Sequence, residues 1–83
     1  MDIIGAVEAI EAFLKTFESS GAQPTEVRVR PSGDDVDVIK VWVDLGNSKV
    51  DTHAWGKACE AAIKSSVPAA AAFTIAVRAE AGA

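Results

Sequence analysis

The chain has 83 residues, of which 49% are hydrophobic and 24% are charged, and its formal net charge is −4 at pH 7. A chain of this length builds one domain around one core, and its apolar runs stay below the ~20 residues of a transmembrane helix. The net negative charge disfavours a general nucleic-acid-binding protein, because such proteins gain much of their affinity from many phosphate contacts.

The sequence contains one cysteine, Cys59, so neither an internal disulfide nor a multi-cysteine zinc site can form. The N-terminal apolar residues follow no basic segment and are interrupted by Glu8 and Glu11, a pattern unlike a signal peptide. We therefore expect a cytoplasmic protein whose fold depends on packing alone.

A first helix is predicted near the N-terminus, where apolar residues recur every three or four positions. Asp2 is its expected N-cap, and Gly21 followed by Pro24 marks its expected end. The opposite side is polar, with Glu11 and Lys15 at the spacing of a helical ion pair. One side of this helix should therefore pack against a core. The predicted apolar stripe consists of Ile3, Ile4, Val7, Ile10, Phe13, Leu14 and Phe17.

A β-hairpin is predicted next. Residues 26–30 alternate between charged and apolar side chains and place Val27 and Val29 on the core side. Residues 31–35 have the proline, serine, glycine and aspartates of a turn, and residues 36–45 form the expected return strand.

Two features of this hairpin are less regular. Val36 and Val38 have outward parity, so either the strand bulges near Val38 and Ile39 or the two valines extend an exposed apolar patch. A register that places Glu26 opposite Lys40 would pair opposite charges across the hairpin, and we expect this register.

A second helix is predicted to start with Asp51 or Thr52 as its N-cap and to stop before Pro68. Trp55 should anchor this helix to the core, and Gly56 beside it allows close approach to a sheet. Residues of the predicted inner stripe are Trp55, Ala58, Cys59, Ala62 and Ile63.

The C-terminal part of the chain is predicted to add one strand. Residues 73–78 alternate with a period of two, whereas the alanine-rich residues 69–72 are compatible with helix or strand. Residues 79–83 are expected to form a frayed tail.

The predicted fold class is therefore α+β, a single small domain over residues 1–83 with the order α-β-β-α-β. A hairpin followed by a crossover helix favours a three-stranded, mainly antiparallel sheet with both helices packed on one face, because right-handed crossovers cover the face that the first helix needs. The strand order stays open. The order of elements is similar in outline to small split β-α-β modules, some of which bind nucleic acid and some of which form oligomers.

The uncovered face of this sheet is the candidate site. A tryptophan supplies a flat apolar contact, and neighbouring cations supply hydrogen bonds and cation–π contacts. The alternative is that the arginine and lysine stems shield Trp42 and nothing binds. The candidate protein-binding residues are Arg28, Arg30, Val36, Val38, Lys40, Trp42 and Arg78.

The sequence gives little support for a catalytic or metal-binding site. His53 and Cys59 lie six positions apart, a rotation of about 240° along a helix, so they should point to different sides and form neither a nucleophile pair nor a metal site. The acidic residues Asp34, Asp35 and Asp37 are expected to form a solvated hairpin tip. We expect no enzyme activity, no cofactor and no metal.

The sequence thus favours a small non-catalytic protein–protein interaction module, an adaptor, assembly factor or inhibitor that binds another protein or itself as a homo-oligomer. The alternatives are single-stranded nucleic-acid binding on the same face and an enzyme with a composite site between subunits. Nucleic acid is the less favoured of the two kinds of binding partner, because Trp42 is the only aromatic residue on that face. The alanine-rich composition favours an accessory protein of a GC-rich bacterium or its phage.

Overall fold

The computed structural model describes residues 3–81. The elements in chain order are α1 (Ile3–Leu14), β1 (Glu26–Pro31), β2 (Val38–Asp44), α2 (Thr52–Ser66), the short 3₁₀ helix η1 (Pro68–Ala70) and β3 (Thr74–Glu80). This order confirms the predicted α-β-β-α-β fold. Among the described residues, no helix is long and apolar enough to cross a membrane. The predicted N-cap Asp2 lies outside the described residues.

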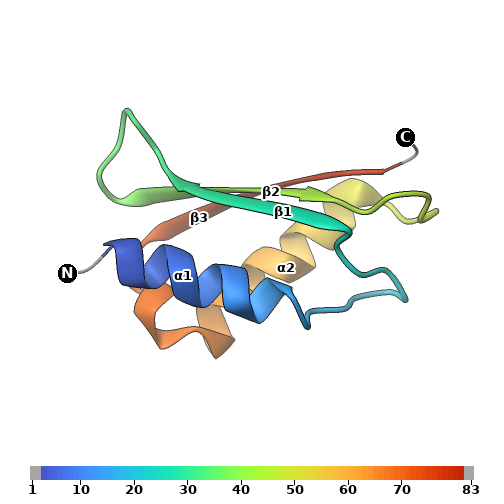
Figure 1. Ribbon diagram of the computed structural model, residues 1–83, viewed down its shortest axis with the longest axis horizontal. Coiled ribbons are helices and arrows are strands. Elements are labelled where there is room, and N and C mark those ends of the chain that lie inside the picture. Colours follow the sequence, from blue (N-terminus) through green and yellow to red (C-terminus); the bar gives the residue numbers. More distant parts are fainter. Residues whose placement is uncertain (1–2, 82–83) are drawn as a thin grey trace.

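The three strands form one sheet in the order β1-β2-β3. Strand β1 runs antiparallel to β2, and β3 runs parallel to β2 after the crossover through α2. The sheet is therefore mixed, and the prediction of a mainly antiparallel sheet describes only its hairpin half. Both helices lie on the same side of the sheet, and within residues 3–81 no helix covers the other side (Figure 1). We call the covered side the inner face and the uncovered side the outer face.

The inner face and the two helices enclose the core. Trp55 is its largest fully buried side chain: its indole Nε1 donates a hydrogen bond to the Ala22 carbonyl oxygen at 3.2 Å, and its ring meets that of Phe17 edge-on at 5.3 Å between centroids. Trp55 thus anchors α2 as predicted. The other buried residues include Ala6, Ile10 and Leu14 of α1, Ile39, Val41 and Val43 of β2, and Cys59 and Ile63 of α2.

Helix α1 ends at Leu14, seven residues before the predicted stop at Gly21. The N–H and hydroxyl groups of Thr16 both donate to the Phe13 carbonyl, at 3.2 and 3.3 Å, and these shorter-range bonds tighten the last turn and end the α-helix. Phe17 therefore packs against the core from outside the helix. Gly21, at φ 76°, instead serves the next turn.

The hairpin register differs from the predicted one. Glu26 lies opposite Asp44, and Lys40 lies opposite Arg30. A register with Glu26 opposite Lys40 would turn Asp37 toward the core, and an unpaired buried carboxylate costs several kcal/mol, about three or more. Desolvation of this aspartate outweighs the gain from one exposed ion pair.

Strand β2 begins at Val38 and pairs regularly with β1, so of the two alternatives for this strand the bulge near Val38 and Ile39 is wrong. Val38 is half-buried on the outer face. Val36 does not belong to the strand; it lies in the hairpin loop with 84% of its surface exposed.

Helix α2 begins as predicted, because the Asp51 carboxylate accepts hydrogen bonds from the backbone N–H groups of His53 and Ala54 at 3.0 and 3.2 Å. The alanine-rich segment after Pro68 is neither α-helix nor strand but one 3₁₀ turn followed by a bend of the chain.

Strand β3 is longer than predicted. The backbone N–H of Leu45 donates to the carbonyl of Glu80 at 2.7 Å, and the pairing of β2 with β3 includes Ala79 and Glu80. The predicted frayed tail 79–83 is therefore wrong for its first two residues, and residues 82–83 lie outside the described residues.

The two outer strands differ at their free edges. In β3, the Val77 N–H points away from β2 and donates to the Glu60 carboxylate of α2 at 3.3 Å. In β1, the ladder bond from the Ser32 N–H to the Val38 carbonyl implies that Val27 and Val29 turn their backbone groups outward. Within residues 3–81 the N–H groups of these two valines find no hydrogen-bond partner.

Candidate functional site

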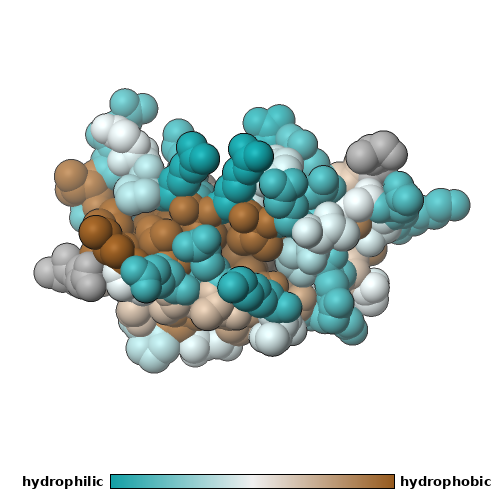
Figure 2. All heavy atoms as spheres, viewed as in Figure 1, coloured by the Kyte–Doolittle hydropathy of each residue, from teal (hydrophilic) through white to brown (hydrophobic). Residues whose placement is uncertain are grey.

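The registers of the two strand pairs order the outer face into rows that run across the strands. Neighbouring rows are two residues apart, or roughly 6.7 Å along a strand. We call them the acidic row (Glu26, Asp44 and Glu80), the central row (Arg28, Trp42 and Arg78) and the basic row (Arg30, Lys40 and Ala76). Val38 and Thr74 follow the basic row. Figure 2 shows hydrophilic side chains projecting from this side of the sheet.

In the central row, both arginines flank the tryptophan. The guanidinium carbon of Arg28 lies 5.3 Å from the ring centroid of Trp42, a cation–π distance, and Trp42 is half-buried. Arg28 also lies 3.5 Å from a carboxylate oxygen of Glu26, and Arg78 lies 3.2 Å from one of Glu80. Arg28 thus covers part of Trp42, as the shielding interpretation predicts, while the acidic row neutralises both arginines.

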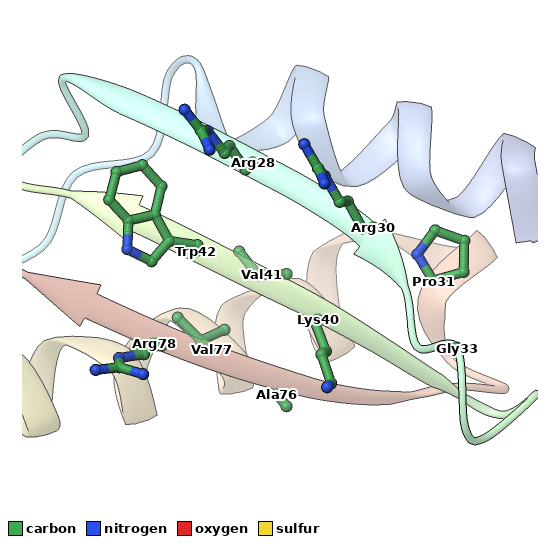
Figure 3. Close-up of a pocket in the computed structure, with 10 residues that line it drawn as sticks. All are labelled: Arg28, Arg30, Pro31, Gly33, Lys40, Val41, Trp42, Ala76, Val77 and Arg78. Carbon is green, nitrogen blue, oxygen red and sulfur yellow. The ribbon is translucent and has the colours of Figure 1, made fainter.

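In the basic row, two cations lie directly opposite each other. Arg30 and Lys40 are both exposed, and neither forms an ion pair with any residue between 3 and 81. Like charges at directly opposed positions destabilise a sheet, and the two side chains extend in different directions (Figure 3). The basic row therefore holds cationic charge that the rest of the described chain leaves unneutralised.

A shallow hollow of about 570 Å³ opens beside these rows. The short side chain of Ala76 leaves room next to Lys40, and the tryptophan ring stands at the other end of the hollow (Figure 3). Among the described residues, no carboxylate lines it. Its charged and aromatic lining comes from Arg28, Arg30, Lys40, Trp42 and Arg78.

The structure thus brings five of the seven predicted site residues to one hollow. Of the two predicted apolar neighbours, Val38 shares the outer face, one row beyond Lys40, whereas Val36 lies in the hairpin loop.

The acidic row was missed by the sequence prediction of a basic face. Alternation could have revealed Glu26, which shares the parity of Arg28, whereas Glu80 was hidden by its assignment to a frayed tail. The rows contain four cationic and three acidic side chains, so their net charge is +1. The face therefore combines both signs of charge in separate rows.

The remaining reactive groups do not assemble into a site. Cys59 is completely buried, and burial, with a smaller contribution from the charge of Glu60, raises the pKa of its thiol to about 12. His53 is exposed at the start of α2, so the two side chains do not meet. Nowhere in residues 3–81 do three or more histidine, cysteine, aspartate or glutamate side chains gather as metal ligands.

Comparisons of this chain with protein families, with curated proteins and with solved structures found no match. The geometry and charge of the outer face are therefore the features of this chain that bear on its function.

Proposed function

We propose that this protein is a non-catalytic interaction module that binds a protein surface through the outer face of its sheet. The observation that supports it is the central row, in which a half-buried Trp42 stands between two arginines beside an open hollow. Adaptor, assembly factor and inhibitor are all roles of such a module.

The central row has the composition of a binding hot spot. Tryptophan and arginine are the residues that most often dominate the binding energy of protein interfaces, and they act best when neighbouring contacts exclude water. Trp42 supplies a flat apolar surface, while Arg28 and Arg78 bring hydrogen-bond donors on either side of it. A partner that covers this row would bury all three side chains together.

Single-stranded nucleic acid is the second candidate, and the four cations around the hollow favour it. The charges of the whole face weigh against it. Two of those cations, Arg28 and Arg78, already contact carboxylates of the acidic row, and a strand that crosses this row would meet its three negative charges. Affinity for nucleic acid depends on many unneutralised cations, and this face offers few.

The test compares three chains: wild type, Trp42→Glu, and the control Ala61→Glu, which adds the same charge on an exposed position of α2. Each is measured by light scattering and used as bait in a cell extract, with circular dichroism to verify the fold. We expect a protein, a second copy included, to be bound by wild type and Ala61→Glu and lost with Trp42→Glu.

Two results would contradict the proposal. Equal binding by folded Trp42→Glu and wild type would show that the outer face takes no part in binding. Binding that disappears after nuclease treatment would establish nucleic acid as the ligand. If Trp42→Glu does not fold, Lys40→Glu replaces it, because Lys40 is exposed and lies outside the core.

A further inference from the structure

The charges on the outer face change sign along the strands. Acidic side chains occupy one end, Trp42 with Arg28 and Arg78 occupies the middle, and Arg30 and Lys40 occupy the other end. We propose that this face binds the outer face of a second copy of the same chain, across a two-fold axis that runs along the central row. The inference rests on the proposed function and names its partner.

A two-fold axis in this position reverses the strand direction of one copy relative to the other. The acidic row of each copy then lies over the basic row of the other, and strand β1 lies over strand β1. Glu26 meets Arg30 of the second copy, and Asp44 meets Lys40 of the second copy. Because a two-fold interface repeats every contact, each of these ion pairs forms twice.

The order of the charges selects a second copy over other proteins. A uniformly acidic partner would meet the acidic row, and a uniformly basic partner would meet Arg30 and Lys40. A surface that fits both ends must carry the same charges in the reverse order, and the outer face of this chain is such a surface when it is turned around. Complementary charge placed in this way fixes orientation and suppresses wrong partners.

The pairing also compensates an unfavourable feature of the isolated face. Arg30 and Lys40 oppose each other without a carboxylate in the described chain. In the dimer each receives a carboxylate from the second copy, and the two Trp42 rings approach each other near the axis, where water is excluded. The axis also brings each arginine of the central row over its counterpart. Arg28 and Arg78 stay close to their own Glu26 and Glu80, which limits this repulsion.

The test exchanges charges between chains. Arg30→Glu places the introduced carboxylate against Glu26 of the second copy, and Glu26→Arg places two guanidinium groups together. Each repulsion occurs twice per dimer, so each variant alone should dimerise roughly tenfold more weakly or worse than wild type. An equimolar mixture pairs opposite charges at both contacts and should restore an affinity close to that of wild type. The double variant Glu26→Arg/Arg30→Glu should dimerise on its own.

Analytical ultracentrifugation over a concentration series measures these affinities, with Ala61→Glu as the unaffected control. A wild-type monomer at every concentration would overturn the inference while leaving a foreign protein as the partner under the proposed function. A wild-type dimer that is insensitive to both charge reversals would also overturn it. Rescue in the mixture with a dimer that survives Trp42→Glu would overturn it in favour of pairing along the edge of β1, which can also bring Glu26 near Arg30.

Discussion

The two faces of the sheet differ although they alternate along the same strands. On β2, Ile39 and Val41 are buried under the helices, whereas their neighbours Lys40 and Trp42 lie on the side that no helix of residues 3–81 covers. The inner face gains stability from apolar burial, and the outer face retains an opposed pair of cations that such a gain does not explain. The core residues and the proposed binding residues are thus neighbours in sequence that lie on opposite faces of the sheet.

The largest expected effect is a difference in stability between variants of the two tryptophans. Trp55→Ala removes a buried ring, its contact with Phe17 and its hydrogen bond to Ala22, and should lower the free energy of unfolding by about 3–5 kcal/mol. Trp42→Ala on the outer face should lower it by only about 1 kcal/mol. Chemical denaturation measures both. Equal losses from the two variants would mean that the outer face is part of the core.

A second test uses the thiol buried beneath the inner face. The pKa of Cys59 rises from 9.0 to about 12 on folding, so between these values the unfolded chain binds fewer protons than the folded one. Stability should therefore be unaffected below pH 9 and should fall as the pH rises toward 12, by up to about 1.4 kcal/mol per pH unit. Denaturation at a series of pH values checks this.

The matched control is Cys59→Ala, which lacks the thiol and keeps every other ionisable group of the chain. The variant should lose stability less steeply than wild type between pH 9 and pH 11. Parallel curves would show that the thiol is not shielded from water.

A smaller effect, of opposite sign, concerns the contact between α2 and β3. A Cβ atom at Gly56 would lie 3.5 Å from the Val77 carbonyl oxygen and 3.8 Å from its Cγ1, which is ordinary contact. Gly56→Ala should therefore be accommodated and should raise the free energy of unfolding by roughly 0.5–1 kcal/mol through its better helix propensity. Thermal and chemical denaturation measure the gain. A loss of stability would show that α2 must approach the sheet more closely than alanine allows.

The smallest expected effect is a gain in stability when one cation of the outer face is removed. Lys40→Thr removes one member of the opposed cations and introduces a residue that favours strands, so the monomer should become more stable by about 0.2–1 kcal/mol. Denaturation of dilute protein measures this, and added salt should reduce the difference. Arg28→Thr is the control; it removes the cation over Trp42 and should not stabilise the chain. Destabilisation by Lys40→Thr would contradict the repulsion.

Much of the fold could be predicted because burial imposes a period on the sequence. The alternation around Val29 and Val41 and the cap at Asp51 are local signals, and the structure contains the elements they predict. The hairpin register could not be predicted from charge pairs, because the register with Glu26 opposite Lys40 would turn Asp37 toward the core, and the free-energy cost of burying its carboxylate exceeds the gain from one exposed ion pair. The end of β3 depends on a partner distant in sequence, the N–H of Leu45, which pairs with Glu80.

The outer face was predicted only in part, because alternation along a strand shows which side a residue faces but not which residues lie beside it on the neighbouring strands. Parity places Arg28 and Trp42 on one side of their strands without further information. The neighbours of a side chain across the sheet depend on register and strand order, so the rows could not be read from the sequence. Glu80 joins Glu26 in one row only because β3 runs parallel to β2 and reaches its full length.

The hydrogen bond from the Val77 N–H to the Glu60 carboxylate has a consequence for aggregation. A filament that grows by strand pairing between molecules needs two sheet edges per molecule that can pair. A chain with one such edge forms only a dimer. Within residues 3–81, Glu60 occupies the middle one of three outward donors of β3, between the N–H groups of Ile75 and Ala79, so a strand added there could not form an unbroken ladder, whereas both outward donors of β1, at Val27 and Val29, stay available. Glu60 would thus block the addition of a strand at β3, and its replacement by alanine should favour growth into fibres.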